Sequence, residues 1–315
     1  MVLIGVSEWF DTEVFFALCL LARVFSGLGA ACIFTVGYAI PQSDYPEELN
    51  EILGLCEFYS GLGLMVGPVV GSSLFYFAGF QGLFYSLAVV FLLTAPLIYK
   101  WLGPDRQYKE GSIVEEQPGL MCFRIIVNAM ALGYSMAMIG FLDTAIAPHL
   151  STYGVREEII GVILACTDCA YTLSSFTLSK VLKHLPLLWV LAFGLLVSSV
   201  AFYLMGPWEY LFPAELSLVI LGMACLSMGL GVILVATLPA LVEVAVIHMG
   251  IENSDKLSDD LSGLATSFMS LGEVVGPLLG GLMVDLYGFN DGAAIMGGVG
   301  MALLLVFLWV ERKRI

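Results

Sequence analysis

The fold is decided by the stretch Gly63-Leu-Met-Val-Gly67-Pro68-Val-Val-Gly71, which is followed by Gly79-Phe80. Its glycines and proline recur in Gly272-Glu-Val-Val-Gly276-Pro277-Leu-Leu-Gly280, followed by Gly288-Phe289, at a constant offset of 209 residues. Glycines four residues apart lie on one face of a helix and let a neighbouring helix approach closely. A Gly-Pro pair loosens the backbone hydrogen-bond ladder and permits a bend. Ordinary packing of small residues explains one copy, whereas two copies in matching register predict an internal repeat.

The sequence around both copies is too apolar for a water-soluble protein. Of the 315 residues, 59% are hydrophobic and 12% are charged, whereas soluble domains carry roughly 25% charged residues. The mean hydropathy is +0.95. The composition therefore predicts an all-α membrane protein, because a helix satisfies its own backbone hydrogen bonds in lipid.

Glycine and proline breaks divide the chain into nine segments that could each span a bilayer, which takes about 20 mostly apolar residues. These segments are 14–40, 52–78, 81–102, 122–149, 158–182, 186–206, 214–246, 260–287 and 291–311. The longest polar stretch lies between the third and fourth segments and is expected to be a loop. Residues 1–10 are apolar but too short to span, so we interpret them as the tail of a helix whose beginning is missing.

Lysine and arginine predict the orientation, because cytosolic loops carry more of them than outer loops. With the longest loop in the cytosol, ten of these residues lie inside, Arg156 lies outside and Arg23 lies within a span. Both copies of the repeat then run outwards from the cytosol, as expected for parallel halves related about the membrane normal. The C-terminus is predicted to be cytosolic.

Several classes of function are disfavoured by the composition. A net charge of −15 argues against nucleic acid as a partner, since phosphate binding needs a basic surface. The seven cysteines are scattered through apolar segments, and the histidines lie at the ends of spans without the spacing of metal ligands. No paired nucleophile and base or phosphate-binding loop stands out. We therefore expect no metal, no cofactor and no enzymatic activity.

The glycine pattern resembles that of the major facilitator superfamily. The antiporter motif in that family's fifth helix is matched by Gly54, Gly61, Gly67, Pro68 and Gly71, and the second copy supplies Gly276, Pro277, Gly280 and Gly281. The stretch 21–30, which contains Arg23, resembles the family's fourth-helix motif with a buried arginine. This register makes the nine spans equivalent to helices four to twelve. The resemblance implies three helices of an N-terminal bundle in residues 1–102, a cytosolic linker in 103–121 and a six-helix C-terminal bundle in 122–315.

Within that superfamily, the resemblance is greatest to the vesicular amine transporters, especially the polyamine-transporting branch. It is carried by residues 57–63, 140–143, 204–207 and 276–281. Such transporters exchange lumenal protons for cytosolic amines, so the resemblance implies antiport. The chain departs from the family at 178–183, where a Gly- and Asp-containing loop is degraded, and at Thr144, where proline is expected. Leu234 and Thr266 replace acids of the monoamine transporters, which favours polyamines over monoamines.

Six ionisable residues lie within the predicted spans, where a charged side chain is costly and marks a functional site by default. They are Arg23, Glu57, Asp143, Asp168, Glu243 and Glu273. By depth, Asp168 and Glu273 lie nearest the midplane, with Glu273 about 13 residues, or ~20 Å, into its span. Desolvation favours the neutral form of a carboxyl group, which suits acids that bind and release protons. Each acid could instead cap a helix break, pair with Arg23 or face a wet crevice.

These observations predict proton-driven antiport of a polyamine-like organic cation by alternating access between two halves. A carboxylate that holds either a proton or an ammonium group couples the two by competition. The expected partners are the cation, protons and the lipid bilayer, with the protein a monomer in a vesicle or plasma membrane. Two alternatives remain: a truncated membrane protein that transports nothing, and a transporter of a neutral drug or sugar whose acids handle only protons.

The predicted topology is tested by labelling cysteines from outside intact cells. A cysteine introduced at Phe10 should be labelled, whereas a cysteine added after Ile315 should be protected. Labelling at the C-terminal site alone would contradict both the topology and the correspondence to helices four to twelve.

Overall fold

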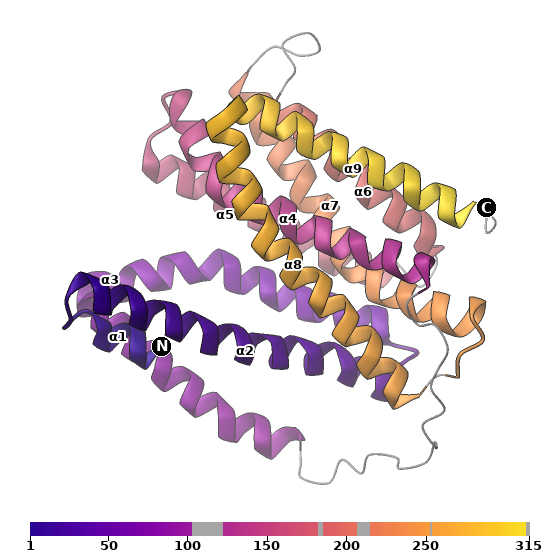
Figure 1. The fold of residues 1–315 in the computed structure, drawn as a ribbon, viewed down its shortest axis with the longest axis horizontal. Coiled ribbons are helices and arrows are strands. Elements are labelled where there is room, and N and C mark those ends of the chain that lie inside the picture. The colour runs from indigo at the N-terminus through magenta and orange to yellow at the C-terminus, as the bar shows by residue number, and fades with distance from the viewer. Residues whose placement is uncertain (103–121, 182–184, 207–214, 253, 313–315) are drawn as a thin grey trace. The chain divides into compact units, whose positions relative to one another are not determined.

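The computed structural model describes residues 1–102, 122–181, 185–206, 215–252 and 254–312, and the regular secondary structure in these ranges is entirely helical (Figure 1). The helices are α1 (Val2–Ser7), α2 (Thr12–Asp44), α3 (Leu49–Leu102), α4 (Phe123–Thr152), α5 (Glu157–Val181), α6 (Leu187–Met205), α7 (Leu216–Glu243), the π-helix η2 (Val244–His248), α8 (Asp255–Tyr287) and α9 (Phe289–Glu311). Eight helices in the described ranges are long and apolar enough to cross a bilayer. The prediction of an all-α membrane protein is confirmed.

Helix α3 accounts for the difference between eight long helices and nine predicted spans. Gly79, at φ 68° and ψ −173°, interrupts its helical backbone and divides α3 into two arms (Figure 1). Glycine adopts this positive φ without the steric cost that a Cβ would impose. At 1.5 Å per residue the arms 49–78 and 80–102 are about 45 and about 34 Å long, so each could span the bilayer's hydrocarbon core of about 30 Å.

The chain divides into two compact units. Unit 1 consists of residues 1–37 and 65–115, and unit 2 consists of residues 38–64 and 116–315. The end of α2 and the beginning of α3 therefore pack with α4–α9 in unit 2. The division into 1–102, 103–121 and 122–315 stays a prediction, and 103–121 lies outside the described residues, as do Lys183 and Pro207.

Close approach of α8 to α4 organises unit 2. A Cβ built on Gly276 would lie 2.5 Å from the carbonyl oxygen of Ala137, and one on Gly272 would lie 2.8 Å from Cβ of Met136. Gly280 is similarly close to Phe141 and Thr144. The second copy of the repeat therefore packs as predicted, with its glycines against a neighbouring backbone.

The first copy of the repeat divides into two parts. Gly61 lies against α5, where a Cβ would be 3.1 Å from Cδ1 of Tyr171. A Cβ on Gly67 or Gly71 would meet nothing within 4 Å. The described residues therefore do not supply the neighbouring helix that the motif predicts at Gly67.

Aromatic side chains fill the interior of unit 2 between α4, α6 and α9. The rings of Phe141 and Phe202 meet edge to face at 5.7 Å, and Phe141 lies 6.1 Å from Phe289. The imidazole of His149 stacks on Phe289 at 3.8 Å between ring centroids. Phe141 and Phe202 are fully buried. Tightly packed rings therefore fill the space between α4, α6 and α9.

Unit 1 is held by contacts among α1, the first part of α2 and the second arm of α3. The rings of Phe15 and Phe80 lie 6.3 Å apart, and the hydroxyl of Ser7 lies 3.5 Å from the thiol of Cys19. A cavity of about 560 Å³ within this unit is lined mainly by small and apolar residues of α2 and α3, among them Gly29, Ala30 and Ala88.

A leucine at Gly276 is expected to lower the thermal unfolding temperature of the protein in detergent. The added side chain would have to part α8 from α4, and overpacking of this kind costs about 1–3 kcal/mol. The matched control is Gly281→Leu on the same helix, because a Cβ there meets nothing within 4 Å. Equal unfolding temperatures for the two variants would show that the contact at Gly276 is unimportant.

Candidate functional site

The most buried of the five predicted acids is Glu57, on the first arm of α3. Its side chain is 7% exposed, and it lies about 12 Å along the helix axis from Leu49. An ionised carboxylate at this depth needs hydrogen-bond donors or a cation to offset the loss of water. The identity of those partners decides what this group can do.

Two tyrosines from two other helices supply the donors. Tyr38, near the end of α2, donates its hydroxyl to Oε1 of Glu57 at 3.1 Å. Tyr171, on α5, donates to Oε2 at 2.5 Å. We call these three residues the Glu57 cluster. It lies entirely within unit 2 and joins α2, α3 and α5 through one carboxyl group.

Small and aromatic residues bring α3 close enough to α5 for the bond between Glu57 and Tyr171. One turn beyond Glu57, Gly61 lies against Tyr171 and Thr172. The rings of Phe58 and Phe176 lie 5.1 Å apart on the same pair of helices. Gly61, predicted as part of the antiporter motif, therefore has the steric role expected of a small residue at a helix contact.

In the part of the chain that the structure describes, the carboxyl group of Glu57 has hydrogen-bond donors but no cation. Among the described residues, its polar partners are the two tyrosine hydroxyls, and no lysine, arginine or histidine lies within ion-pair distance. By contrast, the buried Glu311 pairs with Arg124 at 3.3 Å. Glu57 is therefore a buried acid whose charge can be neutralised by an added proton or an added cation.

A second set of polar contacts joins the end of α2 to the beginning of α8. Ser43 donates to Oδ1 of Asp255 at 2.6 Å, and the Ser262 hydroxyl lies 3.5 Å from Oε1 of Gln42. Further along α8, Glu273 is exposed and forms no hydrogen bond or ion pair with a described residue, but it interacts electrostatically with Tyr38. Glu273 therefore lies in the electrostatic neighbourhood of the Glu57 cluster.

Asp143 on α4 and Asp168 on α5 form an acidic pair. Their carboxyl groups are near enough to interact electrostatically. Asp143 is exposed and Asp168 is partly exposed. For the described part of the chain, neither carboxylate has a cationic partner. The structure thus brings together two acids that are 25 residues apart in sequence.

The other two predicted residues are Glu243 and Arg23. Glu243 is the last residue of α7, immediately before η2, and is partly buried. Arg23 is exposed on α2 in unit 1, and no acid among that unit's described residues pairs with it. The sequence analysis did not single out Tyr38 and Tyr171. Their only signal in sequence was a phenol group within an apolar span.

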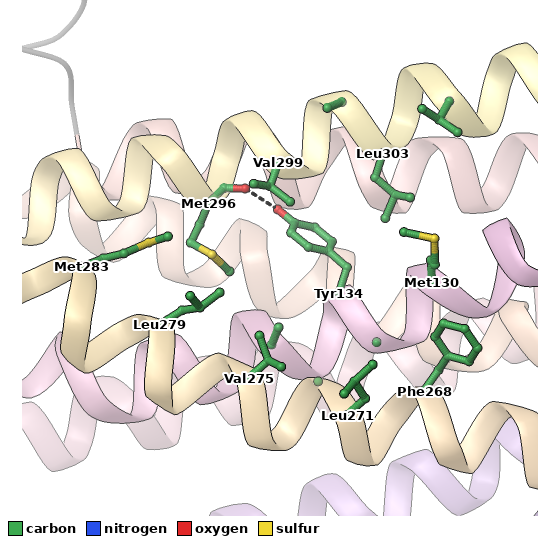
Figure 2. A pocket seen from close by; sticks show the side chains of 15 residues that line it. Met130, Tyr134, Phe268, Leu271, Val275, Leu279, Met283, Met296, Val299 and Leu303 are labelled. Carbon is green, nitrogen blue, oxygen red and sulfur yellow. Dashed lines mark hydrogen bonds between the residues drawn. The ribbon is translucent and has the colours of Figure 1, made fainter.

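A separate cavity in unit 2 is apolar and does not suit a charged ligand. It measures about 490 Å³ and lies between α4, α8 and α9. Figure 2 shows the Tyr134 side chain reaching from α4 towards α9, where its hydroxyl donates to the carbonyl oxygen of Met296 at 2.8 Å. The rest of the lining is made of apolar side chains and glycine, including Leu271, Val275 and Leu303. A cation would find no counter-charge there.

The fold and the placement of acids within spans define a polytopic helical membrane protein with titratable groups in its interior. The family model of the Major Facilitator Superfamily matches residues 1–251. The chain belongs to this superfamily of transporters. It is therefore a multi-pass membrane protein with the architecture of a transporter and not of an enzyme.

Individual relatives agree with this assignment. The MFS-type transporter SLC18B1 of Homo sapiens is 28% identical over 320 residues, which are 96% of this chain and 68% of the relative. The vesicular acetylcholine transporter of Mus musculus is 27% identical over 321 residues, covering 96% of this chain and 58% of the relative. The predicted resemblance to vesicular amine transporters is confirmed.

A solved structure has the same fold. The crystal structure of the human organic anion transporter MFSD10 (TETRAN) matches with a TM-score of 0.64 over 97% of this chain and 75% of that one. The two sequences are 16% identical, so the likeness concerns the fold alone.

The cluster geometry predicts the stability of variants at Glu57. Glu57→Leu should lower the unfolding temperature, because a buried hydroxyl left without an acceptor costs about 1–3 kcal/mol. Adding Tyr171→Phe should recover part of this loss, since it removes the orphaned hydroxyl. Adding Tyr134→Phe instead is the control and should recover nothing, because that hydroxyl bonds to a backbone carbonyl. Equal recovery by both second substitutions would contradict a direct bond between Glu57 and Tyr171.

Proposed function

We propose that the chain is a proton-coupled antiporter of organic cations, polyamine-like in charge, and that Glu57 is one of its coupling carboxyl groups. The observation that carries the proposal is a buried carboxyl held by two tyrosine hydroxyls with no cation among the described residues. Such a group accepts a proton or an ammonium group, but not both. Competition for one carboxylate is the simplest physical link between proton and substrate.

Energetics favour exchange at this position. Removing an ionised carboxylate from water costs several kcal/mol, which two hydrogen bonds offset only in part. A bound proton removes the charge, and a bound ammonium group balances it. Both loaded forms are therefore stabilised relative to the empty, charged form.

The acidic pair of Asp143 and Asp168 supports a substrate with more than one positive charge. The two carboxylates share a region on α4 and α5 and lack a cationic partner among the described residues. A ligand with several ammonium groups would engage both this pair and Glu57. Relatives named as vesicular acetylcholine and synaptic vesicular amine transporters agree with an organic cation as substrate.

The remaining residues receive roles in the same scheme. Glu273, exposed near Tyr38, is a second proton-binding acid. Glu243, at the end of α7, is a further coupling acid. Arg23 tunes a neighbouring acid or holds helices together, since arginine keeps its charge when desolvated. The protein functions as a monomer with a cytosolic C-terminus in a vesicle or plasma membrane. Residues 1–102 and 122–315 move as two bundles about the linker 103–121.

Uptake of radiolabelled spermidine into proteoliposomes with an acidic interior tests the proposal. Wild-type uptake should depend on the pH gradient and disappear when a protonophore dissipates it. Glu57→Gln keeps the side-chain size but cannot titrate, so gradient-driven uptake should fall to the level of protein-free liposomes. Asp285→Asn, at an exposed acid near the end of α8, is the matched control and should transport normally.

Competing ligands separate the proposal from its alternative. Excess unlabelled spermidine should abolish uptake, whereas neutral drugs or sugars should leave it unchanged. Inhibition by neutral compounds alone would favour a neutral substrate with acids that handle only protons. Wild-type uptake that is the same with and without the pH gradient would overturn proton coupling.

A further inference from the structure

We infer that Tyr38 and Tyr171 are positioning residues for Glu57, and that together they form a clasp that closes when the carboxylate is charged and loosens when it is neutralised. The inference rests on the proposed role of Glu57 in proton coupling. It adds a specific device by which the state of one carboxyl group changes the contact between α2, α3 and α5.

The clasp follows from the way its three residues are distributed. Tyr38 lies on α2, Glu57 on α3 and Tyr171 on α5, so one carboxyl group bridges three helices. Each carboxylate oxygen accepts a hydrogen bond from one tyrosine hydroxyl. Each neighbouring helix is therefore bound through a different oxygen. Loss of either hydrogen bond therefore releases a different helix from Glu57.

Neutralisation weakens this bridge for a simple electrostatic reason. An ionised carboxylate receives two charge-assisted hydrogen bonds, which are roughly twice as strong as bonds between neutral groups. A protonated Glu57 keeps only neutral bonds, and an ammonium group competes with the hydroxyls for the same oxygens. In the buried environment of Glu57, at 7% exposure, water does not compensate for the lost donors.

Other titratable groups near the clasp could also make its opening depend on pH. On α3, Cys56 adjoins Glu57, and on α5 the nearest acid is Asp168, one turn before Tyr171. On α8, Glu273 interacts electrostatically with Tyr38, and Asp255 accepts a hydrogen bond from Ser43 at the end of α2. A test must therefore separate Glu57 from Asp255, Asp168 and Glu273.

Two exposed residues at the helix ends can report an opening of the clasp. Tyr45 directly follows α2 and is 54% exposed, and Val181 ends α5 and is 43% exposed. Both residues belong to unit 2. Spin labels at these positions report the separation of α2 from α5 without occupying the cluster.

The experiment measures the distance between the two labels by pulsed electron paramagnetic resonance in proteoliposomes without substrate. The seven native cysteines are replaced by alanine, and each variant is compared in alkaline and acidic buffer. The parent protein should show a longer distance at acidic pH. Glu57→Gln should show the longer distance in both buffers, because its amide imitates the neutral carboxyl group.

The tyrosine variants test the positioning role itself. Tyr38→Phe and Tyr171→Phe should each reduce the pH-dependent change by roughly half, since each removes one of two charge-assisted bonds. Tyr134→Phe is the matched control and should keep the full change, because its hydroxyl bonds to a backbone carbonyl in the same unit. A full change in both tyrosine variants of the cluster would overturn the inference.

Acid variants assign the response to one carboxyl group. Asp255→Asn keeps an acceptor for Ser43 and should retain the pH-dependent change. If Asp168→Asn or Glu273→Gln abolished the change while Glu57→Gln kept it, the clasp would be wrong and that other acid would be responsible. The experiment measures a distance and not uptake. If the wild-type protein showed the pH-dependent distance change but no proton-driven spermidine uptake, only the proposed function would be contradicted.

Discussion

Helices in lipid associate without a hydrophobic driving force, so their contacts depend on how closely two backbones can approach. In this chain that constraint is met by glycine. Gly272, Gly276 and Gly280 give α8 a flat face against α4, and Gly61 does the same for α3 against α5. The second contact has a chemical consequence, because it places Tyr171 within hydrogen-bond distance of a carboxyl group on the neighbouring helix.

The Glu57 cluster illustrates how a transporter can keep an acid in its interior without a permanent salt bridge. Glu311 shows the other solution, with Arg124 and Asn128 bound to its carboxylate. An arginine partner fixes the charge, because guanidinium does not lose its proton. Tyrosine donors stabilise the carboxylate but, among the described residues, leave its charge unbalanced. Two buried acids of one unit thus have different chemistry because their partners differ.

Some features of the molecule follow from the sequence alone. The nine apolar segments, their breaks and the repeat at Gly67 and Gly276 predicted the helical architecture, because spanning a bilayer leaves a chain few alternatives. Gly79 was expected near a connection, and its positive φ divides α3 there. Boundaries were reproduced to within a few residues for most helices, with α8 beginning five residues earlier than expected, at Asp255.

The sequence by itself determined the class of protein and a set of candidate acids, because polar groups within apolar spans are conspicuous. It could not rank those acids, since depth along a helix does not reveal which face a side chain occupies. Only the tertiary structure decided that Glu57 is enclosed by Tyr38 and Tyr171, that Asp143 lies near Asp168, and that a Cβ on Gly67 would meet no described residue within 4 Å. The physical reason is that hydrogen bonds between helices depend on the rotation and separation of each pair, which are set by packing across the whole unit.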